Sequence, residues 1–231
     1  MDIDEFVAEL EADLQWRETE IQLHMKQLIR APASDHDVLR KSLVLMLYAH
    51  VEGFAKFGLT HYISAINKAN LQIADVSYCI AAAALTNLFK ELRNPDQKSE
   101  YFRGLLPDDT ALHRFARDRG FLEGYNKYIA KKSLSLSDSV VDLESNLKVE
   151  VLLKNLYKLG LPYRDTKNFK SELTTLLNFR NQIAHGSFRG GIDQGRYKLC
   201  KDGFDKVNKF MKSTLTEAFK DRAYLLTNSY Y

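Results

Sequence analysis

Apolar residues recur every three to four positions along most of the chain, which is the spacing that places them on one face of an α-helix. Proline and glycine end several of these stretches, since neither continues a helix easily. The pattern predicts an all-α fold, a helical bundle built on a long up-and-down helix pair near the start of the chain. The helices are expected at about residues 4–29, 35–69, 77–93, 110–131, 147–159, 169–185 and 204–226.

Two stretches depart from the helical spacing. Residues 133–139 alternate serine with apolar residues, which is the only strand-like pattern in the sequence. Residues 95–110 are polar and indicate a connector between helices. Gly53 and Gly58 lie inside the longest apolar stretch, where glycine lowers helix propensity, and they indicate either close helix packing or a bend.

With 231 residues, 45% of them hydrophobic and 27% charged, the chain has the composition of an ordinary globular protein. Its 11 glycines and 4 prolines are too few for an all-β fold with many turns. We expect one domain over residues 1–231, with an N-terminal helix over 1–30 and a core bundle over 35–226. Residues 1–30 carry eight acids and three bases, a net charge of −5, so with +3 for the whole chain the remainder carries +8. This basic remainder is compatible with an anionic partner and equally with a solvated charged surface.

Several function classes find no support in the sequence. There is no glycine-rich phosphate loop, no Gly-x-Ser-x-Gly elbow, and no pairing among the six histidines that suits zinc. The two cysteines cannot form a disulfide scaffold, and we expect both to be reduced thiols. No apolar run reaches the ~18 residues needed to cross a bilayer, and the N-terminus lacks the basic region of a signal peptide. We therefore expect a cytoplasmic protein without membrane contact.

One short motif carries residues with chemical potential. Arg180, Asn181 and His185 lie at the end of a predicted helix, directly before Gly186. Asn181 and His185 are four residues apart and share a face of the helix. Arg180 and His185 are five apart, so they diverge by roughly 140° and are separated by ~7.5 Å along the axis. One helix cannot direct both side chains at a single atom, but a wide cleft or a second copy across a twofold axis could bring them around one phosphate.

These three residue types suit phosphodiester transfer. A histidine can take or give a proton near pH 7. An arginine matches the geometry of a phosphate and stabilises the charge that grows on it, and an asparagine can orient the histidine or the scissile group. The alternative is a structural role, in which His185 caps the last carbonyls of the helix.

Two motifs resemble those of a known superfamily. The run from Arg180 to Gly186 reads Arg-Asn-Gln-Ile-Ala-His-Gly and resembles the Arg-x4-6-His signature of HEPN proteins. Residues 48–54 read Tyr-Ala-His-Val-Glu-Gly-Phe and are similar to the Tyr-Ala-His-x-Glu-Gly-Phe helix of standalone bacterial HEPN proteins. The motifs occur in the expected order on the two expected helices, and the resemblance would cover about residues 35–226.

The resemblance implies a helical bundle that forms a homodimer and brings two Arg/His pairs into one cleft. It implies a metal-independent endoribonuclease, in which the RNA 2′-hydroxyl attacks the adjacent phosphate and leaves a cyclic phosphate and a 5′-hydroxyl. Many such proteins are toxins or act in defence against phage, whereas inactive members serve as RNA-binding or interaction scaffolds. We expect RNA as substrate, no cofactor and no metal, and an antitoxin or another defence-system protein as a further partner.

The predicted site residues are Arg180, Asn181 and His185 as catalytic groups, with Glu52 and Tyr48 in support. Glu52 lies in a mostly apolar helix on the same face as Tyr48, and a buried carboxylate needs a partner. Arg180 or Asn181 would supply that partner. The alternative is a surface ion pair between Glu52 and Lys56.

Basic residues follow the signature directly and are the best candidates for contacts with the RNA backbone, namely Arg189, Arg196 and Lys198. A solvated basic face is the alternative. Ser187 stands where some HEPN toxins carry a tyrosine that a partner nucleotidyltransferase modifies, so neutralisation by that modification is not expected. His50 is expected to be a packed or exposed helix residue.

Overall fold

The computed structural model describes residues 1–130, 134–144 and 146–230, and it confirms the predicted all-α class. No β-strand occurs in this part of the chain, where an isolated antiparallel bridge joins Val76 to Leu225. The α-helices are α1 (Ile3–Arg30), α2 (His36–Lys68), α3 (Tyr78–Ala84), α4 (Thr86–Arg93), α5 (Thr110–Ile129), α6 (Val149–Lys158), α7 (Lys170–Ala184) and α8 (Gln194–Lys220). Short 3-10 turns are η1 (Ala33–Asp35), η2 (Asp138–Val140) and η3 (Arg164–Phe169).

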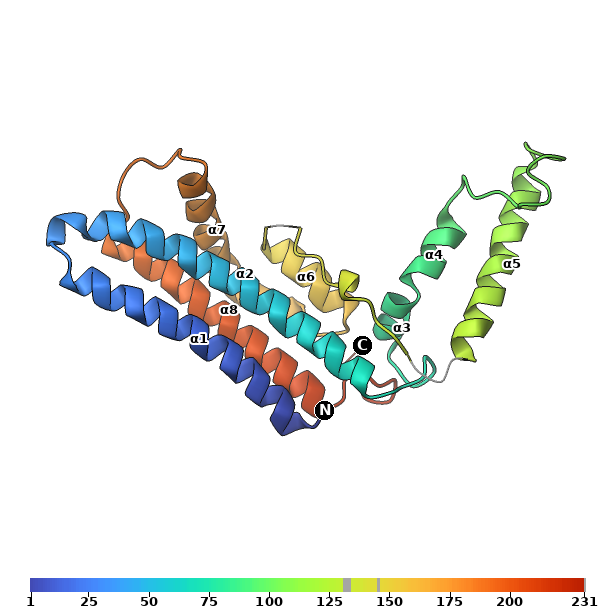
Figure 1. The fold of residues 1–231 in the computed structure, drawn as a ribbon, viewed down its shortest axis with the longest axis horizontal. Helices are drawn as coiled ribbons and strands as arrows, with labels where there is room; N and C mark the ends of the chain where they lie inside the picture. Colours follow the sequence, from blue (N-terminus) through green and yellow to red (C-terminus); the bar gives the residue numbers. More distant parts are fainter. Residues whose placement is uncertain (131–133, 145, 231) are drawn as a thin grey trace.

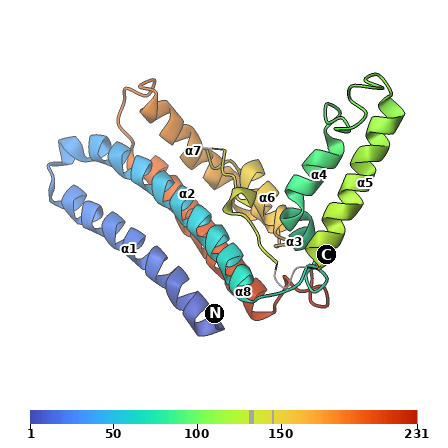
Figure 2. The ribbon, with the colours of Figure 1, turned by 45° about the vertical axis from the view of Figure 1, so that its right-hand side comes forward.

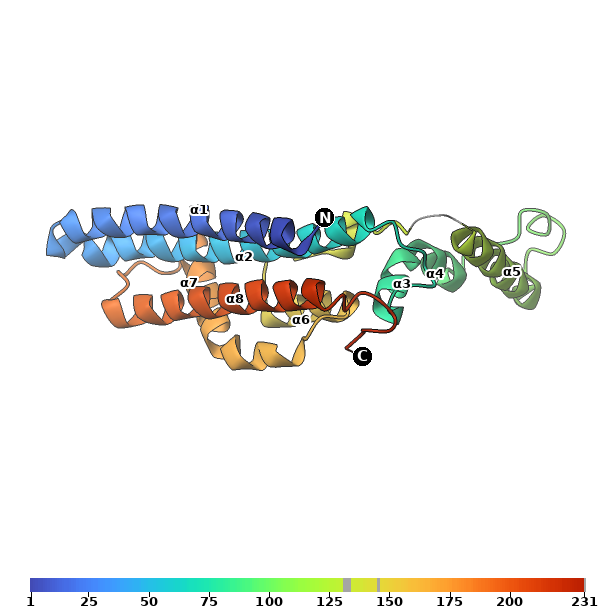
Figure 3. The same ribbon diagram turned by 90° about the horizontal axis from the view of Figure 1, so that it is seen from below.

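Three long helices, α1, α2 and α8, lie side by side and form the body of the molecule (Figures 1 and 2). Helix α7 crosses this body and packs against α2 and α8 (Figure 3). Helix α2 therefore has neighbours on several sides, and it buries apolar side chains around most of its circumference. Its largest fully buried side chains are Leu47, Tyr48, Phe54, Leu59, Tyr62, Ile63 and Ile66.

The two glycines inside α2 mark close packing, and the helix is continuous through both. A Cβ at Gly58 would lie 2.6 Å from Cδ1 of Leu215 on α8. A Cβ at Gly53 would lie 2.5 Å from Nη1 of Arg17 on α1. Each glycine thus lets a side chain of a neighbouring helix approach the α2 backbone, which outweighs its cost in helix propensity.

Helices α4 and α5 extend from one end of the body as a helical arm, with α3 at its base (Figures 1 and 2). The two helices meet through a tilted aromatic pair, Phe89 and Phe121, whose ring centroids are 5.4 Å apart. Few side chains of the arm are buried, and several large apolar ones remain exposed, among them Tyr101, Leu105, Phe115 and Leu122. The arm therefore has little hydrophobic core of its own.

The stretch predicted as one helix over 77–93 consists of two helices in the structure. The chain leaves ideal helical geometry at Leu85, whose φ and ψ are −90° and 10°. The Thr86 hydroxyl donates a hydrogen bond to the Ala83 carbonyl at 2.8 Å. A threonine hydroxyl that bonds back to the preceding turn is a known cause of helix bending, and it explains the break.

The last helix was predicted over 204–226 and begins ten residues earlier, at Gln194. Asp193 caps this start, because its carboxylate accepts the backbone N–H of Arg196 at 2.9 Å. Gly190, Gly191 and Gly195 lie around this point, and glycine disfavours a helix, but the Asp193 cap outweighs their effect. The helix ends before Arg222, whose φ of 52° is the left-handed conformation of a helix stop.

The strand-like stretch is extended but pairs with no strand. Ser133 lies outside the described residues. Beyond it, Leu134 and Leu136 are buried and Ser135 is exposed, which follows the alternation of the sequence. Asn67 of α2 takes the place of a partner strand, since its side chain bonds to the N–H and the carbonyl of Leu136 at 2.8 and 2.9 Å.

Candidate functional site

The end of α7 carries the Arg-Asn-x-x-x-His motif. His185 caps the helix through its backbone, whose N–H donates to the Asn181 carbonyl at 3.0 Å. Gly186 follows with φ of 71°, so the chain turns away directly after the histidine. The His185 ring is exposed and forms no hydrogen bond or ion pair with any described residue. The ring is therefore accessible from solvent and does not cap the helix itself.

Arg180 is half buried and held in place from two sides. Its guanidinium lies over the ring of Tyr48, 4.8 Å from the ring centroid. Its Nη1 donates a hydrogen bond to Oδ1 of Asn181 at 2.8 Å. The Asn181 side chain thus bonds to the arginine, and only the Asn181 backbone carbonyl bonds to His185. Within the described residues no carboxylate forms an ion pair with Arg180, so its charge has no acidic partner.

Tyr48 is the platform beneath this arginine. The ring is fully buried, and its hydroxyl accepts the N–H of Leu147 at 2.6 Å and donates to Oδ1 of Asn146 at 3.0 Å. Burial, assisted by the charge of Glu52, raises the pKa of Tyr48 to about 12 against the opposing effects of the Leu147 N–H and Arg180. The phenol is therefore neutral at physiological pH and fixes α2 to the segment before α6.

Glu52 pairs neither with Arg180 or Asn181, the predicted partners, nor with Lys56, the alternative. The side chain is half buried, and the described residues include no ion pair or hydrogen bond to it from Arg180, Asn181 or Lys56. Partial exposure explains the difference, because a carboxylate that still reaches water needs no protein partner. Glu52 acts on the site only through its charge, which contributes to the raised pKa of Tyr48.

His50 lies on the opposite face of α2, away from Arg180, and of the two expected settings, packed or exposed, it takes the packed one. It is buried, its ring meets Trp16 edge-on with centroids 5.3 Å apart, and its Nε2 lies 3.0 Å from Oε2 of Glu20. Burial lowers the pKa of His50, with a smaller contribution from Arg17, while Glu20 opposes the shift. His50 belongs to the contact between α1 and α2.

Arg17 of α1 is a buried charge that the sequence analysis did not identify. Its Nε lies 2.7 Å from Oδ2 of Asp13, and its guanidinium lies 4.5 Å from the Trp16 ring centroid. The group occupies the space above Gly53. The four-residue spacing of Asp13 and Arg17 along α1 is typical of an ion pair on a helix surface. The burial of this pair depends on Gly53 of α2, which lies far away in the sequence.

The loop that follows His185 is bound to the first turns of α2. Lys41 donates to the Phe188 carbonyl at 2.9 Å, and the N–H of Ile192 donates to the Asp37 carbonyl at 2.8 Å. A Cβ at Gly191 would lie 2.4 Å from Cβ of Asp37, so glycine is required for this close approach. The loop thus has a defined course between α7 and α8.

The predicted RNA-binding residues lie on this loop and at the start of α8, and all three are exposed. Arg196 forms an ion pair with Asp193 at 3.3 Å. Arg189 and Lys198 form no ion pair with any described residue. The charge of Arg196 is therefore partly neutralised, whereas the charges of Arg189 and Lys198 remain available to an external partner.

Two general features complete the description. In residues 1–130, 134–144 and 146–230, no three His, Cys, Asp or Glu side chains converge as they would to hold a metal ion. None of the helices in the same ranges combines the length and the apolar character of a membrane span.

A protein-family model described as HEPN_MAE_28990-like HEPN matches residues 6–223. No curated protein and no solved structure gives a significant match. The matched range includes nearly the whole chain, both sequence motifs and the helical body that holds them. The chain therefore belongs to the HEPN family.

Proposed function

We propose that this protein is an endoribonuclease that cleaves RNA without a metal, in a cleft shared by two copies of the chain. Family membership suggests a nuclease-like or RNA-related role, since HEPN proteins are often ribonucleases. The observation that carries the proposal is Arg180, which Tyr48 and Asn181 hold in place without an acidic partner among the described residues. A fixed guanidinium of this kind is suited to an anion, and RNA presents phosphodiesters.

The proposed reaction is an attack of the 2′-hydroxyl on the adjacent phosphorus. The P–O2′ bond forms and the P–O5′ bond breaks, while one proton leaves O2′ and one reaches O5′. The products are a 2′,3′-cyclic phosphate and a 5′-hydroxyl. His185 transfers the protons, and Arg180 stabilises the charge that the phosphorus centre gains in the transition state. Asn181 is a positioning residue, because it contacts Arg180.

The proposed dimer follows from the divergence of the two side chains. Arg180 lies against Tyr48, while the His185 ring is exposed beyond the end of α7. In a twofold pair, the arginine of one copy can serve the histidine of the other, and the two histidines can serve the two proton transfers. We propose that such an enzyme acts as a toxin or an antiphage effector and is restrained by a partner protein.

One observation favours a second function, a scaffold that binds RNA without cleaving it. The His185 ring has no hydrogen-bond partner among the described residues that would orient it. Catalytic histidines are usually oriented by a second group. In the enzyme, the second copy must supply this orientation.

Subunit complementation tests the enzyme and its shared cleft together. Arg180→Ala and His185→Ala proteins are assayed for RNA cleavage separately and after mixing under conditions that exchange subunits. We expect each variant to be inactive and the mixture to recover part of the activity, because mixed dimers contain one intact arginine and one intact histidine in place of two of each. The exposed Arg119→Ala variant is the control and should retain full activity. Full activity of either single variant would refute the assignment, and absence of cleavage by the wild-type protein would favour the scaffold.

A further inference from the structure

A small pocket lies where the end of α1 meets the beginnings of α2 and α8. Its volume is about 330 Å³, which is near the lower end of the range for small-molecule sites. It is lined by Met25, Leu28, Ile29, His36, Arg40, Gln194, Tyr197, Lys198 and Lys201. The lining contains apolar residues and cations but no carboxylate.

The apolar part of the pocket comes from α1 and from Tyr197. Leu28 and Tyr197 are buried, and the Tyr197 hydroxyl contacts the sulfur of Met25 at 3.0 Å, which fixes the ring. Ile29 remains 72% exposed at the edge. We call this apolar part of the pocket, lined by Leu28, Ile29 and Tyr197, the slot. Aliphatic and aromatic side chains of this kind can contact the face of a flat apolar group.

Cations from two helices, Arg40 of α2 and Lys198 and Lys201 of α8, line the same pocket. Arg40 is paired with Asp37 and Lys201 with Asp205, each at 2.5 Å. Lys198 is exposed and forms no ion pair with any described residue, so its charge is available to a ligand. An apolar slot and a lysine without an ion pair in the same pocket match the two parts of a nucleotide, a base and a phosphate.

The pocket is connected to His185 by the loop 186–193. Arg40 lines the pocket and also donates to the carbonyl of Ile192, at 3.4 Å. Eight loop residues span at most ~28 Å, so an RNA strand of modest length can reach from the histidine to the pocket. Arg189 is exposed on the loop between the two positions.

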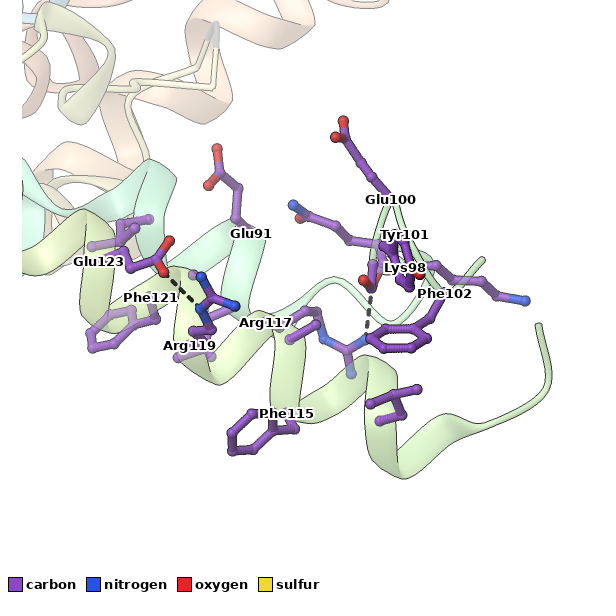
Figure 4. A pocket seen from close by; sticks show the side chains of 17 residues that line it. Glu91, Lys98, Glu100, Tyr101, Phe102, Phe115, Arg117, Arg119, Phe121 and Glu123 are labelled. Atoms are coloured by element: carbon purple, nitrogen blue, oxygen red, sulfur yellow. Dashed lines mark hydrogen bonds and ion pairs between the residues drawn. The ribbon is translucent and has the colours of Figure 1, made fainter. Parts of the chain in front are cut away.

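A cleft of the arm between α4 and α5 provides a contrast in charge (Figure 4). It has a volume of about 610 Å³ and aromatic walls. Three carboxylates and three cations line this cleft, namely Glu91, Glu100 and Glu123 with Lys98, Arg117 and Arg119. Such a balanced surface does not attract a polyanion, whereas the pocket between α1, α2 and α8 does.

We propose that the pocket between α1, α2 and α8 binds one unstacked nucleotide of the RNA, with the base in the slot and its phosphate at Lys198. The choice of RNA rests on the proposed function. The pocket holds the strand away from the cleavage site, and it gives the enzyme a base contact beyond the electrostatic contacts of the loop.

Binding of a fluorescently labelled single-stranded RNA to the full chain carrying His185→Ala tests this, since that background prevents cleavage. The pocket variant Ile29→Ala/Lys198→Ala removes two exposed side chains. The matched control, Leu199→Ala/Lys209→Ala, removes an exposed leucine and an exposed lysine of α8 outside the pocket. We expect about tenfold weaker binding for the pocket variant and a salt dependence reduced by about one unit of slope, with no change for the control. Equal binding by the two variants would overturn the proposal.

Cross-linking identifies the occupant. RNA that contains 4-thiouridine should cross-link to the peptide with Tyr197, and a cross-link confined to the arm would contradict the proposal. An excess of nucleoside monophosphate should reduce this cross-link, whereas inorganic phosphate at the same concentration should not. Cross-linking to the peptide with Tyr197 in the absence of wild-type cleavage would support the nucleotide pocket and refute only the proposed RNA cleavage. Cleavage with no effect of the pocket variant would refute only the pocket.

Discussion

The two faces of one segment of α2, residues 48–54, differ in whether the charged side chains packed against them have partners of opposite charge. On the face toward α1, Arg17 is paired with Asp13, and His50 is in contact with Glu20. On the face toward α7, Arg180 lies over Tyr48 with no acidic partner among the described residues. The charges on the first face are buried and paired, whereas the second face is partly open and carries the charges of Arg180 and Glu52 without an ion pair among the described residues.

The difference shows that residues 48–54, which form one motif in the sequence, have two roles: one face packs against α1, and the other supports Arg180. Gly53 makes room for Arg17 and holds α1 against α2. Tyr48 supports the arginine of α7. Substitutions on the α1 face should therefore change stability first, and substitutions on the α7 face should change RNA cleavage first.

The largest effect is expected for Arg17→Ala. Loss of this guanidinium leaves the carboxylate of Asp13, whose side chain is 13% exposed, without its partner. Breaking a buried ion pair in this way should lower the free energy of unfolding by about 3 kcal/mol. Urea denaturation measures it. Arg119→Ala is a matched control, because its pair with Glu123 has the same 2.7 Å distance but 71% and 55% exposed side chains. Removal of that exposed pair should cost less than about 1 kcal/mol. Equal losses would show that the α1 face is not a compensated interior.

Arg180→Ala should reduce RNA cleavage strongly and stability weakly, whereas Arg17→Ala is expected to act mainly on stability. Cleavage should fall by about a hundredfold or more, because the transition state loses its fixed cation. Stability should change less than in Arg17→Ala, since Arg180 is half buried and breaks no ion pair among the described residues. Arg180→Lys should not restore activity, because an ammonium cannot reproduce the planar contact with Tyr48. Single-turnover rates and urea midpoints measured on the same samples decide this, and recovery by lysine would contradict the assigned geometry.

Tyr48→Phe removes the hydroxyl and keeps the aromatic ring, so it distinguishes the effect of one from that of the other. The phenylalanine ring can still lie beneath Arg180, so cleavage should stay within a few-fold of wild type. The backbone N–H of Leu147 loses its acceptor, which should lower the free energy of unfolding by about 1–2 kcal/mol. A large loss of activity at unchanged stability would show that the hydroxyl has a role in the reaction.

The pH dependence of stability should give the smallest effect. The pKa of His50 is lower in the folded protein than its ordinary value of 6.5. As the pH falls below about 6.5, the unfolded chain takes up the proton first, so the contribution of His50 to stability is full above that pH and is lost as the pH falls through the folded pKa. Urea midpoints between pH 7.5 and 5 should fall more steeply for wild type than for His50→Gln. Parallel curves would place His50 in a solvated setting.

The sequence predicted the helical class and the two motifs because both depend on local spacing. It did not predict the break at Leu85 or the start of α8 at Gln194, because single side-chain hydrogen bonds from Thr86 and Asp193 decide these points. The partner expected for Glu52 was wrong for another reason. Its partial exposure depends on tertiary packing, and spacing along one helix does not report that.

The arginine site shows the same limit. Its residue types were evident, but the stacking of Arg180 on Tyr48 joins residues 132 positions apart and appears only in the fold. The burial of Arg17 against Gly53 is similarly non-local. Residue chemistry was therefore readable from the sequence, and the division of the 48–54 segment into two faces was not.

The most direct test of the central claim is RNA cleavage in excess chelator by purified wild-type protein and by His185→Ala. The account predicts that wild type cleaves, leaving 2′,3′-cyclic phosphate and 5′-hydroxyl ends, and that His185→Ala is at least about a hundredfold slower with the same helix content and the same dimer mass. Equal cleavage by the two proteins, or loss of wild-type activity on chelation, would contradict it.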